Sequence, residues 1–450
     1  MRAKHNPQSS LFDPEPVDHP VADDLEWASE WLDAHPELVD AVAADLGAAD
    51  APGPGRCGLS CETVLRCAVL LHLRQASYRK LAFLLADSRS AQRFARLDPT
   101  RPPPGKSALQ ATVGAVGAAT WEAVGLRLLN EAQRAGVEKG AAVRIDSTVT
   151  ETHVLAPSDS RLLFDGVRVL TRLLRQARDG LGASAIDFHD HCRAAKRRAR
   201  EAGSQRGAKR RAGTYRKLLR LAGRTRGYVE SALPAVIAAD APWSPRWVEA
   251  ARACLDLLDR VVDQTERRVF GGEKVPAAEK VVSLFEPHTD IIVKGGRGTS
   301  YGHKVNLSTG RSGLVLDVVV EDGNPADSAR CLPMLKRHVG RYGEPPSRAA
   351  FDGGYASKEN LKEAKALGIE HVAFNRKRGL KAADMTPSSW LYRRLRNFRA
   401  GVEAGISYLK RCFGLGRCLW RGLERFKAYV HSAVFAHNLM RLARLRPKLA

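Results

Sequence analysis

The hydrophobic pattern of the chain changes at residue 141, and this change constrains the fold more than any other feature. The segment "AAVRIDSTVTETHV" (141–154) alternates apolar and polar side chains and is rich in β-branched residues, which predicts a strand. The residues before it, from about 59, have the three- and four-residue spacing of helices. We therefore expect an all-helical N-terminal region followed by a part that contains a sheet.

The next strand signals come only after a long helical stretch, from about residue 159 to 270. Strands are predicted at 301–309, 314–322, 347–352 and 371–375, and helices at 327–339, 358–367 and from about 390 onwards. Without the long stretch the order is β-β-β-α-β-α-β-α. Three leading strands favour an antiparallel meander, and the later alternation favours parallel strands with crossover helices. The sequence thus predicts an α/β fold with a mixed sheet and flanking helices.

The N-terminal helices have recognisable starts. Residues 1–54 are expected to form a polar arm with one short amphipathic helix at about 25–38, and "APGPG" (51–55) breaks the chain there. Helix starts are then expected at Ser60, Ser77–Tyr78, Asp87–Ser88 and Ser107. The helix that Ser107 caps is expected to run to about Ala135.

Four parts are therefore expected along the chain. They are an arm with a short helix (1–54), a helical domain (55–138), a sheet-containing domain (139–158 with 295–440) and a basic helical insertion (159–294).

The insertion carries the densest charge. Between His191 and Arg226 there are fourteen Lys or Arg residues and one acid, Glu201. A solvated helix face usually mixes charges of both signs, and this one does not, which favours a segment that binds a polyanion. The formal net charge of +23 for the whole chain agrees with a nucleic-acid partner.

Several other classes of protein lack support in the sequence. The N-terminus has no apolar signal segment, and no run of 18 apolar residues predicts a membrane span. The eight cysteines form no C-x2-C pair, which favours reduced thiols and a cytoplasmic protein. With a nucleic-acid partner, such a protein is expected to be associated with the nucleoid. Neither a G-x4-G-K-[ST] nor an H-E-x-x-H motif is present.

Two aspartates stand where a carboxylate is unusual. Asp352 follows the apolar strand "RAAF", and Gly353 and Gly354 leave room beside it for a metal ion or a phosphate. Asp146 lies inside the strand "VRIDSTV", where a charge is costly unless it is paired or coordinates a cation. A simple pair with a nearby arginine, or a position facing solvent, would explain Asp146 equally well.

A third acidic candidate lies near the C-terminus. Arg399, Glu403 and Lys410 fall on one face of a predicted helix. An exposed Arg–Glu pair is the simpler interpretation. However, Gly401 and Gly405 flank Glu403 at a cost in helix propensity, which favours a site that something approaches closely.

These segments together resemble a known family. The spacing Arg399-x3-Glu403-x6-Lys410 matches the tail of the Tyr-x2-Arg-x3-Glu-x6-Lys signature of DDE transposases from bacterial insertion sequences. The segments "RIDST" and "FDGGY" resemble those around the family's two catalytic aspartates. The stretches "YGHKVNLST" with "VVVEDGNPADS", "GLSCETVLRCAVLLHLRQASYRKLAFLLADS" and "RRVFGGEKVPAAEKVVSLFEPHTDII" are similar as well. From about residue 7 to 440 the chain resembles the ISNCY family of transposases.

The resemblance implies an RNase H-like fold and an enzyme that cuts insertion-sequence ends and joins the 3′-OH to target DNA. It assigns the catalytic and metal-binding roles to Asp146, Asp352 and Glu403, with two Mg²⁺ or Mn²⁺ ions. Double-stranded DNA is the expected partner, the helical domain the expected reader of transposon ends, and a homodimer or larger assembly the expected active form. The expected DNA-binding residues are Arg399, Lys410 and Lys304, and in the insertion Arg197, Arg198, Lys209, Arg210 and Arg211.

The sequence also departs from the family pattern. Arg396 stands where the signature has tyrosine. The insertion lies between the two aspartates, whereas relatives with an insertion domain carry it between the second aspartate and the glutamate. Two alternatives therefore stay open: an RNase H-like nuclease without strand transfer, and a non-catalytic DNA-binding repressor derived from a transposase.

Overall fold

The computed structural model describes residues 4, 18–47, 58–98, 100–293, 298–375 and 379–446. The chain forms two units: Met1–His153 with His303–Ala450, called unit 1, and Val154–Gly302, called unit 2. Residues 1–3, 5–17 and 48–54 of the predicted N-terminal arm, the break at 51–55 and the predicted boundary at 294 lie outside the described residues.

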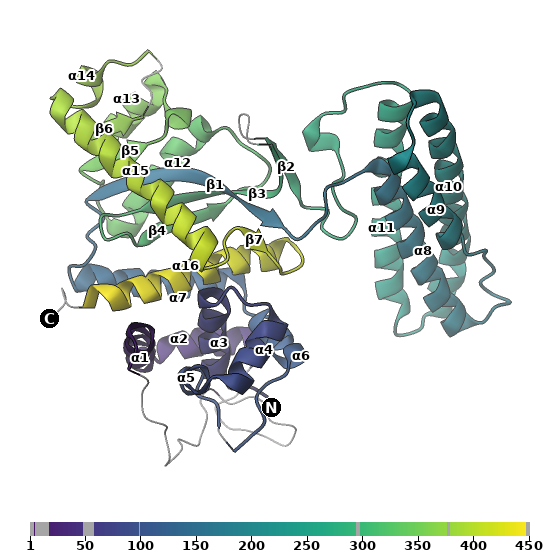
Figure 1. Ribbon diagram of the computed structural model, residues 1–450, viewed down its shortest axis with the longest axis horizontal. Coiled ribbons are helices and arrows are strands. Elements are labelled where there is room, and N and C mark those ends of the chain that lie inside the picture. Colours follow the sequence, from purple (N-terminus) through teal and green to yellow (C-terminus); the bar gives the residue numbers. More distant parts are fainter. Residues whose placement is uncertain are drawn as a thin grey trace. The chain divides into compact units, whose positions relative to one another are not determined.

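Unit 1 is built on a mixed sheet, as the sequence predicts (Figure 1). Its strands are β1 (Ala142–Thr152), β3 (Thr299–Thr309, which begins in unit 2), β4 (Val315–Val320), β5 (Arg348–Phe351), β6 (His371–Phe374) and β7 (Arg417–Cys418). The order is β3-β1-β5-β6, with β4 paired to β3 and β7 paired to β1. The β1–β5 and β5–β6 pairs are parallel and the β3–β4 pair is antiparallel. The carboxyl ends of β1, β5 and β6 therefore point the same way.

Helices cover this sheet. The helices of unit 1 that follow unit 2 in the sequence are α12 (Asp327–Tyr342), α13 (Lys358–Ala366), α14 (Ala382–Met385), α15 (Ser389–Cys412) and α16 (Leu423–Leu445). Those before it are α1 (Pro20–Asp33), α2 (Glu37–Leu46), α3 (Cys61–Leu73), α4 (Tyr78–Asp87), α5 (Arg89–Phe94), α6 (Lys106–Val113) and α7 (Ala118–Arg134). Helix α15 packs on β1, β5 and β6, and α16 packs along α7 and α3. One apolar core runs from the N-terminal helices to the sheet.

The serine caps are confirmed at three of the four helix starts. The hydroxyl oxygens of Ser60, Ser77 and Ser88 accept hydrogen bonds from backbone N–H groups of α3, α4 and α5, at 3.2 to 3.3 Å. Ser107 is not a cap, because α6 already begins at Lys106 behind Gly105.

Two helix lengths predicted from the sequence are wrong. The single helix expected at 25–38 is two helices, because Pro36 has no N–H to continue α1 and instead precedes α2. The helix expected to run from Ser107 to about Ala135 is divided into α6 and α7, with the glycines Gly114 and Gly117 at the break.

Unit 2 contains the long helical stretch. Its helices are α8 (Asp159–Leu181), α9 (Cys192–Ser204), α10 (Ala208–Ala239) and α11 (Ser244–Val269), and they enclose an apolar core of their own. A short strand that the sequence pattern did not predict, β2 (Asp290–Val293), pairs antiparallel with residues 299–302 of β3. The expected helical insertion is thus a separately packed helical bundle with a short β-ribbon.

A buried ion pair holds α12 to β4. Asp317 is 5% exposed, and Arg337 donates hydrogen bonds to both of its carboxylate oxygens at 2.7 and 2.9 Å. Burial by itself raises the pKa of Asp317, but the hydrogen bonds from Arg337 and the charge of Arg341 together bring that pKa below its ordinary value. We expect Asp317→Ala to lower the free energy of unfolding by about 2 kcal/mol, because it removes the acidic partner of Arg341, which is mostly buried, and the two hydrogen bonds from Arg337.

Urea unfolding measures this cost. Asp322→Ala, at an exposed position five residues away, should change the free energy of unfolding by no more than about 0.5 kcal/mol. Equal effects of the two substitutions would contradict the role given to Asp317.

Two buried histidines predict acid sensitivity. Burial lowers the pKa of His72, in α3, to about 3 and that of His437, in α16, to about 4, from an ordinary value of 6.5. Between pH 4 and 6.5 the unfolded chain binds protons at these positions that the folded chain does not, so stability falls as the pH falls. From pH 7 to pH 5 we expect a loss of about 2 kcal/mol for each histidine.

The variant His72→Gln isolates one of them. Its amide can still bond the Ser432 hydroxyl, which His72 contacts at 2.7 Å. The difference in unfolding free energy between pH 7 and pH 5 should shrink by about 2 kcal/mol. An unchanged difference would show that His72 does not titrate as its burial implies.

Candidate active site

Three neighbouring strands bring polar side chains into one row. The β1–β5 register pairs Ile145 with Phe351, and the β5–β6 register pairs Phe351 with Phe374. The next residue of each strand is polar: Asp146, Asp352 and Asn375. Because adjacent strands lie about 4.8 Å apart, these three side chains are neighbours, at the point where β5 and β6 end beside the middle of β1.

Helix α15 adds an arginine and a glutamate to this row. It crosses the sheet against β1 and β5 (Figure 1). Arg399 and Glu403, one turn apart, form an ion pair of 2.9 Å between Nη1 and Oε1. The close packing depends on Gly401, since a Cβ atom there would lie 2.0 Å from an amino nitrogen of Arg144 in β1. The Arg144 side chain is therefore what approaches α15 closely at this glycine.

The guanidinium of Arg399 contacts all three predicted carboxylates. Its Nη2 lies 3.1 Å from Oδ2 of Asp146 and 3.3 Å from Oδ1 of Asp352, in addition to the Glu403 pair. Arg399 is 8% exposed, whereas the side chains of Asp352 and Glu403 are 39% and 62% exposed. Three carboxylates that lie far apart in the sequence thus share one buried arginine, at a site with an open side.

Both simpler interpretations of these acids are also seen. Asp146 does pair with an arginine, and Glu403 does form an i, i+4 pair with Arg399. Each pair by itself would be ordinary. Three carboxylates and one guanidinium leave a net charge of about −2, which the Arg399 contacts do not neutralise. The cluster therefore has the capacity to bind further positive charge.

Asn375 is a member of the cluster that the sequence pattern did not single out. Its amide nitrogen donates a long hydrogen bond of 3.5 Å to Oδ1 of Asp352, and its amide oxygen accepts one of 3.2 Å from Nε of Arg396. The sequence offered one signal for it: Asn375 ends the predicted strand that follows the one ending at Asp352. Asn375 and Arg396 together orient the open side of Asp352.

The space at Gly354, beside Asp352, is occupied by a side chain of the protein. A Cβ atom on Gly354 would lie 2.8 Å from Oδ2 of Asp327, so this glycine makes space for a neighbouring side chain and not for a ligand. Asp327 in turn pairs with Lys304 at 2.8 Å.

The contact with DNA that was expected of Lys304 does not agree with its position. Lys304 is 5% exposed, pairs with Asp327 and donates a hydrogen bond of 2.5 Å to the carbonyl of Pro325. It therefore joins β3 to the start of α12. Lys410 is half-buried in the last turn of α15.

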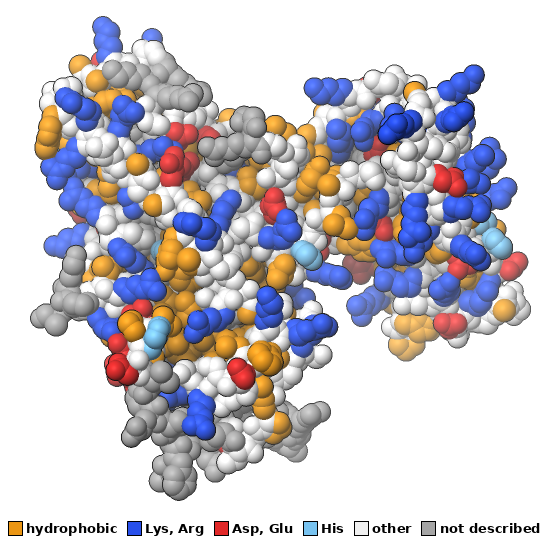
Figure 2. Space-filling view, viewed as in Figure 1, with side chains coloured by type: hydrophobic (Ala, Val, Ile, Leu, Met, Phe, Trp, Pro, Cys, Tyr) orange, Lys and Arg blue, Asp and Glu red, His pale blue; other side chains and the backbone are white. Residues whose placement is uncertain are grey.

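The other basic candidates lie in unit 2. Figure 2 shows Lys and Arg side chains gathered over the four-helix unit, at the right of the view. Arg197 and Arg198 both pair with Glu201, at 3.9 and 2.6 Å. Lys209, Arg210 and Arg211 are exposed in the first turns of α10, and the described residues give them no acidic partner.

The carboxylate cluster fits a divalent cation in donor type. Mg²⁺ and Mn²⁺ prefer oxygen ligands, and Asp146, Asp352 and Glu403 offer three carboxylates that already surround one cationic group. In the part of the chain that the structure describes, however, no three His, Cys, Asp or Glu side chains are arranged as a metal site. The arginine stands among the carboxylates, so metal binding requires Arg399 to move aside.

Comparison with known proteins gives a match to one family model. Residues 260–439 match a family model described as a transposase DDE domain. The match supports a DDE transposase, and its residues include Asp352, Arg399, Glu403 and Lys410 but not Asp146, which precedes unit 2 in the sequence. No curated protein and no solved structure matches the chain. Among the described residues, no helix is long and apolar enough to cross a bilayer.

Proposed function

We propose that this protein cuts DNA at the ends of a bacterial insertion sequence of the ISNCY family and joins the freed 3′-OH to target DNA. The single observation that carries this proposal is the convergence of Asp146, Asp352 and Glu403 on Arg399. The match to a transposase DDE domain makes DNA the substrate class. The strand order and the mixed parallel and antiparallel pairing support an RNase H-like fold for the sheet of unit 1.

In this proposal the three carboxylates hold two divalent cations. Asp146 and Asp352 would bind both ions between them, and Glu403 would complete the ligands of one. The bound ions would supply activation of the attacking oxygen and stabilisation of the leaving oxygen of the phosphodiester. The chain's own contribution is to hold the acids on a rigid sheet and helix, with Asn375 and Arg396 fixing the side chain of Asp352.

Arg399 has two roles in the proposed cycle. Without metal it neutralises part of the charge of the carboxylates. If cations were bound by these carboxylates, the Arg399 guanidinium would be free to bind a DNA phosphate bidentately close to the cut. Lys410, further along the same helix, is proposed to contact the DNA backbone beyond it.

The basic helices of unit 2 are proposed to hold DNA without reading its sequence. Lys209, Arg210 and Arg211 lie at the amino end of α10, where the helix dipole disfavours positive charge. These cations therefore do not stabilise the helix, whereas they would bind the phosphates of a DNA backbone. Arg197 and Arg198 on α9 are proposed to contact the same DNA backbone. They share one acidic partner, Glu201, so the three side chains together keep a net positive charge.

Two further parts of the proposal concern assembly. The N-terminal helices are proposed to read transposon ends, and the active complex, which brings two ends together, is proposed to be at least a dimer. The continuous core from these helices to the sheet supports a rigid link between end recognition and cutting.

The test is a strand-transfer assay. Supercoiled DNA that carries the element's ends is incubated with the protein, Mg²⁺ and a second target plasmid, and the products are sequenced. The proposal expects cuts at the ends and joints between those ends and the target. Cuts without joints would favour a nuclease without strand transfer, and tight binding without cuts would favour a repressor.

A further inference from the structure

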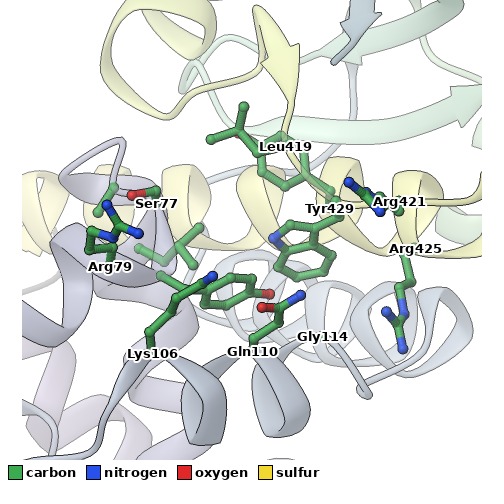
Figure 3. Close-up of a pocket in the computed structure, with 13 residues that line it drawn as sticks. Ser77, Arg79, Lys106, Gln110, Gly114, Leu419, Arg421, Arg425 and Tyr429 are labelled. Atoms are coloured by element: carbon green, nitrogen blue, oxygen red, sulfur yellow. The ribbon is translucent and has the colours of Figure 1, made fainter. Parts of the chain in front are cut away.

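A cavity of about 410 Å³ lies within unit 1, apart from the carboxylate cluster. One wall comes from the starts of α4 and α6, and the other from the segment between β7 and α16 (Figure 3). A space of this volume is within the range of small-ligand sites. Nothing in the proposed chemistry of Asp146, Asp352 and Glu403 uses it.

Four cations surround this cavity: Arg79, Lys106, Arg421 and Arg425. Figure 3 shows Arg79 and Lys106 on one side, and Arg421 and Arg425 on the other. All four are exposed, none has an acidic partner among the described residues, and none of the described lining residues is acidic. Since like charges that face one pocket repel each other, their convergence indicates an anionic ligand.

The cavity lining includes two aromatic side chains, Tyr78 and Trp420, and a buried hydroxyl group. The rings of Tyr78 and Trp420 stack, with centroids 6.1 Å apart. The Tyr78 hydroxyl is buried, and the described residues provide no hydrogen-bond partner for it. A Cβ atom on Gly114 would lie 3.3 Å from this hydroxyl, so the glycine keeps the space beside it open. Leaving a buried hydroxyl unpaired is costly, and a ligand oxygen would remove that cost.

We propose that this cavity binds a phosphate group of the DNA strand, with the cations neutralising its charge and the Tyr78 hydroxyl donating a hydrogen bond to it. The proposal rests on the proposed function, because it takes DNA as the substrate, and it adds a second point of attachment. The geometry of the sheet favours DNA over a free anion. Residues 417–418 of β7, which lead into the cavity wall, pair with Glu151 and Thr152 at the end of β1.

In this proposal one DNA duplex contacts both the carboxylate cluster and the cavity. Glu151 is five residues beyond Asp146 on an extended strand, which is about 17 Å. This is the length of about five nucleotides of B-form DNA. In this proposal a strand cut at the carboxylate cluster runs along β1 towards the cavity wall, and the held phosphate would fix how far away the cut lies.

The test measures DNA affinity without cutting. Fluorescence anisotropy of a labelled duplex carrying the element's end is recorded in EDTA at several salt concentrations. Lys106→Ala should weaken binding about tenfold and reduce the slope of log K against log salt by about 0.9, the value for one phosphate contact. Tyr78→Phe should weaken binding roughly fivefold without changing the slope, since it removes a neutral donor.

Two controls keep the result interpretable. Tyr78→Phe removes a buried hydroxyl that has no partner among the described residues, so its thermal unfolding temperature should be equal to or higher than that of the wild type. Arg127→Ala removes an exposed cation on α7, outside the cavity lining, and should leave affinity unchanged within about twofold.

The possible outcomes distinguish failure of the cavity proposal from failure of the proposed function. Wild-type affinity for DNA in both Tyr78→Phe and Lys106→Ala would overturn the cavity proposal, and end cutting by these variants would leave the proposed function standing. Loss of pyrophosphate binding in calorimetry, with DNA affinity unchanged, would show a site for free phosphate and also overturn it. A wild type that does not bind DNA at all would overturn the proposed function itself.

Discussion

Asp352→Asn is expected to abolish metal-dependent cutting at the element's ends and to leave the fold intact. Asparagine keeps the shape of the side chain and can still meet Asn375, but it loses the charge that binds a cation and the Arg399 pair. A lost metal ligand removes about 4 kcal/mol of transition-state stabilisation, which is about 10³-fold in rate. The measurement is the initial rate of end cleavage with Mg²⁺ or Mn²⁺.

The matched control is Asp322→Asn, an exposed carboxylate just after β4. Its cleavage rate and thermal unfolding should equal those of the wild type. DNA affinity in EDTA should be the same for all three proteins. Cleavage that persists in Asp352→Asn would remove this residue from the site and direct attention to another metal centre.

The second large effect is expected at Arg399. If the guanidinium and the metal ions compete for the same carboxylates, the wild type must break the Arg399 ion pairs, worth about 1.4 kcal/mol in total, before it binds a cation. Arg399→Gln has no such pairs, so it should bind Mn²⁺ about tenfold more tightly than the wild type. Without metal the same variant should be less stable, since three carboxylates then repel each other. Mn²⁺ should restore its unfolding temperature.

Isothermal titration with Mn²⁺ measures the affinity directly, without reference to activity. Arg393→Gln, an exposed position on the same helix α15, provides the control and should titrate as the wild type does. Weaker Mn²⁺ binding in Arg399→Gln would mean that Arg399 supports the metal site and does not compete with it.

The sequence singled out the three carboxylates that meet at Arg399, but it did not predict most of their other contacts. The positions of Asp146 and Asp352 followed from strand patterns, and the i, i+4 pair of Arg399 with Glu403 followed from helical spacing. Asn375 could not be singled out, because an asparagine after a strand is usually a turn residue. Only the register of β5 and β6 shows that it lies beside Asp352.

The errors have a common physical cause. Lys304 was assigned to DNA and Gly354 to the space for a ligand because the residue that both contact, Asp327, lies more than 20 positions away from each of them in the sequence. Tertiary contacts of this kind leave no periodic signal. The mixed sheet and the helical insertion, in contrast, depend on local patterns and were predicted, whereas the two-residue strand β7 was too short for any pattern.

The most direct test of the central claim is to locate Mn²⁺ in crystals of the protein by anomalous scattering. The account predicts a peak between the carboxylates of Asp146 and Asp352, with the guanidinium of Arg399 turned away from them, and no such peak in Asp352→Asn. A peak at another group of side chains, or an Arg399 that keeps all three ion pairs at saturating Mn²⁺, would contradict it.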